Sequence, residues 1–134
     1  MDFQRLARIR LRDARALLRA GNNEGAYYLT GLAVECGLKS AIARKTRRYD
    51  FPPEPKIVSK QIYVHDLNTL LGAAGLAATL DAAATANPAL KVNWAVVKDW
   101  TNDSRYLLSA GSAPALYRAA AGQNGVLRWL RQYW

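Results

Sequence analysis

The stretch GAYYLTGLAVECGLK, residues 25–39, decides the fold of this chain. It reads almost like a membrane span, but it carries two charged side chains, Glu35 and Lys39. Placing an acid and a base in the middle of a span costs about 2.5–3.5 kcal/mol for each of them. We therefore expect this stretch to be the buried central helix of a soluble protein.

The chain has 134 residues, 51% of them hydrophobic and 22% charged, which predicts one globular domain over residues 1–134. Its first residues, MDFQRLARIRLRD, do not have the pattern of a signal peptide. With a single cysteine, Cys36, and a single histidine, His65, neither an internal disulfide nor a Cys/His metal site is expected. We expect a cytoplasmic protein without a cofactor.

The composition favours helices, because Ala and Leu are frequent, β-branched residues are sparse, and no segment alternates like a half-buried strand. We therefore expect an all-α fold, a compact up-and-down bundle of four to six helices. The expected helices cover residues 2–20, 24–45, 66–74, 76–86, 93–101 and 113–133, with a proline-containing loop over 46–63. Gly122 and Gly125 should weaken the last helix locally.

The first expected helix carries a stripe of arginines on one side. At about 100° per residue, the stripe occupies an arc of roughly 80°. Its members are Arg5, Arg8, Arg12, Arg15 and Arg19. A solvated face usually mixes charges of both signs, whereas a stripe of one sign repels itself. Together with the net charge of +9, the stripe predicts binding of phosphate, although a plain solvated face is the alternative.

Four other positions have side chains that could serve a function. Glu35 and Lys39, four residues apart, form either an interhelical polar contact, to which Arg10 also donates, or the floor of a cleft where Lys39 reaches phosphate. Arg105 either pairs with a nearby aspartate or lines a cleft. His65 stands at a helix start without evident partners, so no catalytic residue is predicted. The candidate binding residues are Arg5, Arg8, Arg12, Arg15, Lys39 and Arg105.

Three motifs follow one another along the chain: GxxxGAYYL at 21–29, AVExxLKS at 33–40 and HDLxxLL at 65–71. In order and spacing they resemble the HEPN domain (higher eukaryotes and prokaryotes nucleotide-binding). The later residues that share this resemblance are Trp94, Trp100, Arg105, Tyr106 and GVLxWL at 125–130. The resemblance implies an all-α bundle that binds a nucleotide or RNA, forms a homodimer, and works beside nucleotidyltransferases in toxin–antitoxin and phage-defence systems.

Many HEPN proteins are ribonucleases that use an arginine followed, after four to six residues, by a histidine. No histidine stands at that spacing after Arg105, and no arginine stands at that spacing before His65. We therefore expect a non-catalytic HEPN-like domain that binds a nucleotide or RNA phosphate. The alternatives are a protein-interaction subunit that partners a nucleotidyltransferase, and a ribonuclease with a non-standard site at His65.

Overall fold

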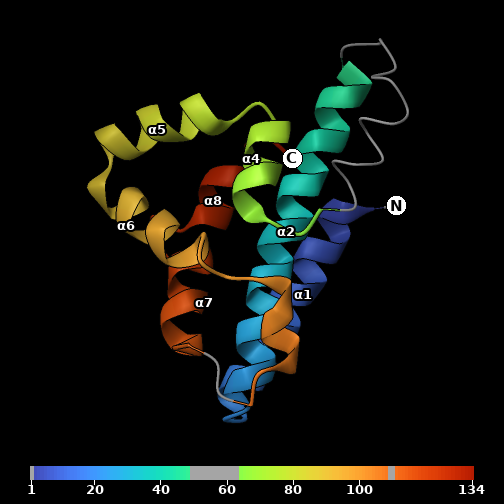
Figure 1. Ribbon diagram of the computed structural model, residues 1–134, viewed down its shortest axis with the longest axis vertical. Helices are drawn as coiled ribbons and strands as arrows, with labels where there is room; N and C mark the ends of the chain where they lie inside the picture. The colour runs from blue at the N-terminus through green and yellow to red at the C-terminus, as the bar shows by residue number, and fades with distance from the viewer. Residues whose placement is uncertain (1, 49–63, 109–110) are drawn as a thin grey trace.

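The computed structural model describes residues 2–48, 64–108 and 111–134, which form seven α-helices and one 3-10 helix and contain no strand. The all-α prediction is confirmed for these residues. Two long helices, α1 (Phe3–Arg19) and α2 (Asn23–Arg48), lie side by side in opposite directions (Figure 1). Of the shorter helices, some pack directly on α2, whereas α5 and α6 pack on each other and α6 packs on α7 and α8.

The N-terminal helix α1 begins and ends at the signals in its sequence. The Asp2 carboxylate accepts a hydrogen bond from the backbone N–H of Arg5 at 2.9 Å and so caps the helix. Gly21, with φ of +79°, takes the left-handed conformation that turns the chain into α2. Ala7 and Ala14 are buried, whereas the arginine stripe is exposed.

The helix α2 is the centre of the domain, as the opening stretch predicted. It contacts α1, α4, α7, α8 and the 3-10 helix, and every residue from 33 to 42 is buried. The helix continues to Arg48, beyond the expected end at 45. The expected loop over 46–63 therefore begins later, and its remainder, residues 49–63, lies outside the described residues.

The next two helices, α4 (Leu67–Ala73) and α5 (Ala77–Ala86), closely match the prediction. Asp66 caps α4 by accepting a 2.8 Å hydrogen bond from the Thr69 N–H, and Gly75, with φ of +72°, ends it. The two helix axes meet at 106°, so α5 leads away from the α1–α2 pair (Figure 1). No single helix within the described ranges is long and apolar enough to cross a membrane, although α4 and α5 meet the length and composition requirement as a bent pair.

The prediction of a helix over 93–101 is wrong in its bounds. Helix α6 (Pro88–Val97) begins five residues earlier than expected, at a proline. Proline fits the first helical position because it has no N–H to leave unpaired there. The segment that follows the expected end at residue 101 folds into the 3-10 helix η1 (Asn102–Tyr106).

The prediction of one continuous helix over 113–133 is also wrong. The chain forms α7 (Ala113–Ala121) and α8 (Val126–Leu130), and Asn124 between them has a φ of +54°. Gly125 approaches the preceding helix so closely that a Cβ atom would lie 2.6 Å from the carbonyl oxygen of Ala120. The helix is therefore interrupted between Ala121 and Val126.

Candidate phosphate-binding groove

A surface groove of about 320 Å³, called here the arginine groove, lies where three helices meet. Its lining residues are Arg8, Leu11, Arg12 and Arg15 of α1, Tyr117 and Ala121 of α7, Arg128 of α8, and Arg131, which directly follows α8. Within each helix these residues are three or four positions apart, so each helix presents one face to the groove. The lining contains five arginines and no acidic side chain.

Part of the positive charge is compensated from within the chain. Arg12 donates from Nε and Nη2 to the Asp13 carboxylate at 3.3 and 3.1 Å, and Arg10 lies 3.8 Å from the other carboxylate oxygen. Asp13 thus relieves some of the repulsion that the stripe was expected to carry alone. For Arg15 and Arg128, no ion pair is formed with another described residue.

One groove arginine also contacts an aromatic ring. The Arg8 guanidinium carbon lies 5.9 Å from the ring centroid of Trp134, which is 9% exposed. This distance is within the range of a cation–π contact. The contact ties the N-terminal helix to the end of the described chain beside the groove.

The structure brings together only some of the predicted binding residues. Arg8, Arg12 and Arg15 line the groove, whereas Arg5 belongs to α1 but is outside the lining. Arg105 lies on η1, where its guanidinium carbon is 4.6 Å from the ring centroid of Tyr106. Arg105 is therefore part of a different surface.

Lys39 is not a groove residue either, because it is buried. It is 6% exposed, and its Nζ lies 3.2 Å from Oε2 of Glu35, which is 3% exposed. The other oxygen of Glu35, Oε1, lies 2.8 Å from Nδ1 of His65. Glu35 thus links α2 to the residue that precedes α4, while Arg10, the expected donor, pairs with Asp13 instead. The Glu35–Lys39 pair is therefore an ion pair within α2, and the contact of Glu35 with His65 is the one that connects it to another segment.

The sequence interpretation missed two groove residues, Arg128 of α8 and Arg131, which follows the end of that helix. Their spacing of three residues was a visible signal that they share a helix face. We did not use this signal, because a continuous last helix gave no reason to expect these arginines near α1.

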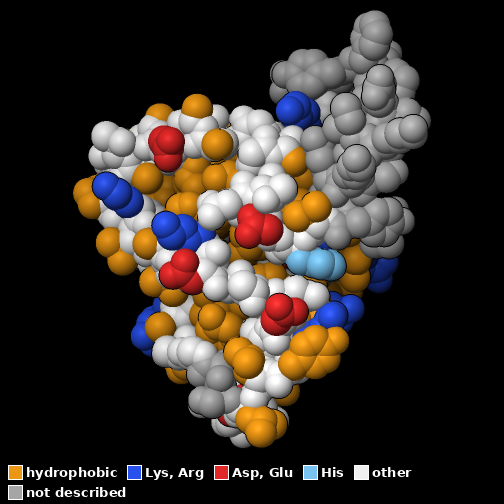
Figure 2. All heavy atoms as spheres, in the orientation of Figure 1, with side chains coloured by type: hydrophobic (Ala, Val, Ile, Leu, Met, Phe, Trp, Pro, Cys, Tyr) orange, Lys and Arg blue, Asp and Glu red, His pale blue; other side chains and the backbone are white. Residues whose placement is uncertain are grey.

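The neighbourhood of His65 has a different character from the arginine groove. His65 lines a pocket of about 280 Å³ together with Asp66, Trp100, Thr101, Asn102 and Asp103. Two of these residues are carboxylates and none is a lysine or arginine, and Figure 2 shows the histidine on a face that also carries acidic side chains. Because carboxylates repel phosphate, this pocket suits a phosphodiester substrate poorly.

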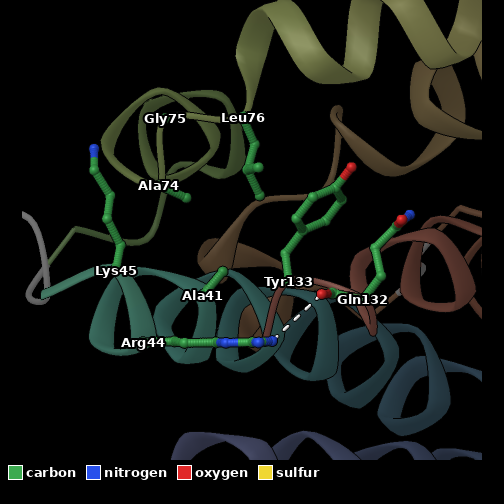
Figure 3. A pocket seen from close by; sticks show the side chains of 8 residues that line it. All are labelled: Ala41, Arg44, Lys45, Ala74, Gly75, Leu76, Gln132 and Tyr133. Carbon is green, nitrogen blue, oxygen red and sulfur yellow. Dashed lines mark hydrogen bonds between the residues drawn. The ribbon is translucent and has the colours of Figure 1, made fainter. Parts of the chain in front are cut away.

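Another pocket, of about 400 Å³, lies between the C-terminal half of α2, the α4–α5 turn and the end of the chain (Figure 3). Its lining residues are Ala41, Arg44, Lys45, Ala74, Gly75, Leu76, Gln132 and Tyr133. Nη1 of Arg44 donates to the carbonyl oxygens of Gln132 and Trp134 at 3.3 and 3.2 Å. This arginine therefore anchors the end of the chain to α2, and the pocket offers fewer cations than the arginine groove.

Within the three described ranges, no group of three or more His, Cys, Asp or Glu residues could hold a metal ion. Comparisons of the chain with protein-family models, with curated proteins and with solved structures find no match.

Proposed function

We propose that the chain is a HEPN-like domain whose arginine groove binds the phosphates of RNA or of a nucleotide without cleaving them. One observation carries this proposal: five arginines from two helices meet in one groove whose lining has no acidic side chain. Two of the five come from α8 and the residue that follows it, a segment separated from α1 by most of the chain.

Guanidinium groups suit this role because each presents several N–H donors in a plane that matches two phosphate oxygens. A polyanion that binds several such groups also releases its condensed counterions, which contributes favourable entropy that falls with added salt. The groove therefore suits a ligand with several phosphates better than it suits a single small anion.

The family resemblance is supported by one contact between its motifs. Glu35 belongs to the AVExxLKS motif on α2, and His65 belongs to the HDLxxLL motif at α4, and the two side chains lie 2.8 Å apart. Motifs that resemble one family in sequence thus meet in space. This contact favours a structural role for both motifs, in which they dock α4 onto α2.

The homodimer and the nucleotidyltransferase partner are further parts of the proposal that come from the resemblance alone. One apolar segment at η1 favours a protein contact there: Tyr106 is 71% exposed, Leu107 52% and Leu108 95%. It lies outside the arginine groove, so a protein partner and a phosphate ligand need not compete.

The test is the salt dependence of RNA binding, measured by fluorescence anisotropy with a labelled single-stranded oligonucleotide. The groove variant replaces Arg15, Arg128 and Arg131 by glutamine. A matched variant replaces the same number of arginines outside the groove lining with the same loss of charge: Arg5, Arg19 and Arg105. We expect the groove variant to lose most of the affinity and to flatten the slope of log K against log salt by about 2, since each lost phosphate contact accounts for about 0.7.

The matched variant separates site binding from general attraction by net charge. It should lose much less affinity and should keep most of the wild-type slope. Equal effects of both variants, or no effect of either, would show that the arginine groove is plain surface.

A further inference from the structure

The arginine groove has an apolar part as well as a cationic one. Leu11, Tyr117 and Ala121 are half-buried, whereas the five lining arginines are exposed. The lining thus combines partly buried apolar side chains with exposed guanidinium groups. A site for phosphate alone would need only the arginines, and not the ring of Tyr117 or the side chain of Leu11.

We infer that the groove selects single-stranded nucleic acid, with one unpaired base against Tyr117 and the flanking phosphates on the arginines of α1 and α8. This inference rests on the proposed function and specifies its ligand. An aromatic ring between cationic groups is the arrangement by which proteins bind single strands, because every base has a flat face that stacks on an aromatic side chain.

A duplex fits this lining less well than a single strand. Its bases are paired and stacked on one another, so their faces are closed to a side chain such as Tyr117. A duplex would contact only the arginines, through its backbone phosphates, and would leave Leu11 and Tyr117 without a partner.

A mononucleotide also leaves part of the groove unused. Arg8 and Arg15 are seven residues apart on α1, which corresponds to about 10 Å along the helix axis. Arg128 and Arg131 approach from another helix. One phosphate cannot contact all these guanidinium groups, whereas a strand places phosphates on both sides of a bound base.

The experiment compares three labelled or competing ligands with equal numbers of phosphates: a single-stranded oligoadenylate RNA, an RNA duplex, and inorganic polyphosphate, which has no bases. The wild-type protein should bind the single strand about tenfold more tightly than either of the others, the difference expected for one stacked base. Removing the bases, by use of an abasic oligonucleotide of the same length, should cost a similar factor and requires no mutation.

The matched variants are Tyr117→Leu, which removes the ring but keeps an apolar side chain, and Tyr117→Phe, which keeps the ring. Tyr117→Leu should lose about tenfold in affinity for the single strand, keep the salt slope, and bind polyphosphate as before. Tyr117→Phe should bind like the wild type. A thermal melt of each variant verifies that it folds.

Each outcome separates this inference from the proposed function. Equal affinities for the single strand, the abasic strand, the duplex and polyphosphate, all reduced by the groove variant, would overturn the inference and leave phosphate binding intact. Absence of binding to all four ligands would overturn both.

Discussion

Replacing Lys39 by methionine tests whether the buried ion pair of α2 is structural. The Lys39 and Glu35 side chains are 7% and 4% exposed, and their charged atoms lie 3.2 Å apart. Methionine keeps most of the side-chain length but leaves the Glu35 carboxylate without one of its two partners. Removing one member of a buried ion pair costs about 3–5 kcal/mol, largely because the other charge stays buried.

The lower end of that range applies here, since Nδ1 of His65 remains 2.8 Å from Glu35. We therefore expect Lys39→Met to lower the free energy of unfolding by about 3 kcal/mol. For 134 residues the unfolding entropy is about 280 cal/mol/K, so the melting temperature should fall by about 10 °C. Urea and thermal unfolding, followed by tryptophan fluorescence and circular dichroism, measure both quantities.

A double-mutant cycle isolates the pair from the packing of the two side chains. The variant with both Glu35→Gln and Lys39→Met should be more stable than the sum of the single changes predicts, by at least about 1.5 kcal/mol. The matched surface cycle, Arg10→Met with Asp13→Asn, should show a coupling energy below about 1 kcal/mol, because both side chains are more than one-third exposed.

Additive effects at Glu35 and Lys39 would refute the structural interpretation. The same Lys39→Met protein, kept below its melting temperature, also tests the sequence expectation that Lys39 reaches phosphate. Its RNA affinity should equal that of the wild type, because Lys39 is 6% exposed and outside the arginine groove. A large loss of affinity in the folded variant would show instead that this lysine contacts the ligand.

Two further predictions concern the core. Gly31→Ala should destabilise the domain by about 1–3 kcal/mol, because a Cβ there would overlap the indole of Trp100. Gly72→Ala, with nothing within 4 Å of its Cβ, should be neutral or stabilising by up to about 1 kcal/mol. Urea unfolding of both variants measures this difference, and equal effects would contradict the prediction. Burial, with a smaller contribution from the Glu35 charge, raises the pKa of Cys36 from 9.0 to about 11. Between these pH values the unfolded thiol loses its proton while the folded thiol keeps it, so stability should fall as the pH rises. Cys36→Ala should reduce this slope in urea unfolding at pH 9 and 10.5, and an unchanged slope would show that the thiol does not contribute.

The helices that the sequence predicted well are those with local signals at both ends. An aspartate caps α1 and α4, and a glycine with positive φ follows each of them, at Gly21 and Gly75. These signals act through hydrogen bonds and backbone angles within a few residues, so they can be recognised without knowledge of the fold.

The bounds that failed depend on backbone conformations that the residue types allow but do not require. Pro88 is compatible both with the end of one helix and with the first turn of the next, and only the fold decides between them. The break before α8 depends on the close approach of Gly125 to the backbone of Ala120. A glycine in the sequence signals that such an approach is allowed, but not that it occurs.

The candidate site combines a pattern within one helix with contacts between helices that are far apart in the sequence. The arginine stripe of α1 is a local pattern, and the structure places Arg8, Arg12 and Arg15 on one face, as the helical spacing requires. A stripe on a single helix is a convex surface, which holds a ligand from one side only. What makes it a groove is the turn between α7 and α8.

Gly122 and Gly125, which lie in that turn, therefore matter for the proposed site. A continuous helix over 113–133 would carry Arg128 and Arg131 along the axis of α7. In the structure the helix is broken between Ala121 and Val126, and Arg128 of α8 and the following Arg131 line the same groove as the arginines of α1 and Tyr117. The fold thus joins two charge patterns, separated by more than 100 residues of sequence, into one cationic site with an aromatic side chain in its lining. The affinity of the groove for a strand should therefore depend on the geometry of this turn as well as on the number of arginines.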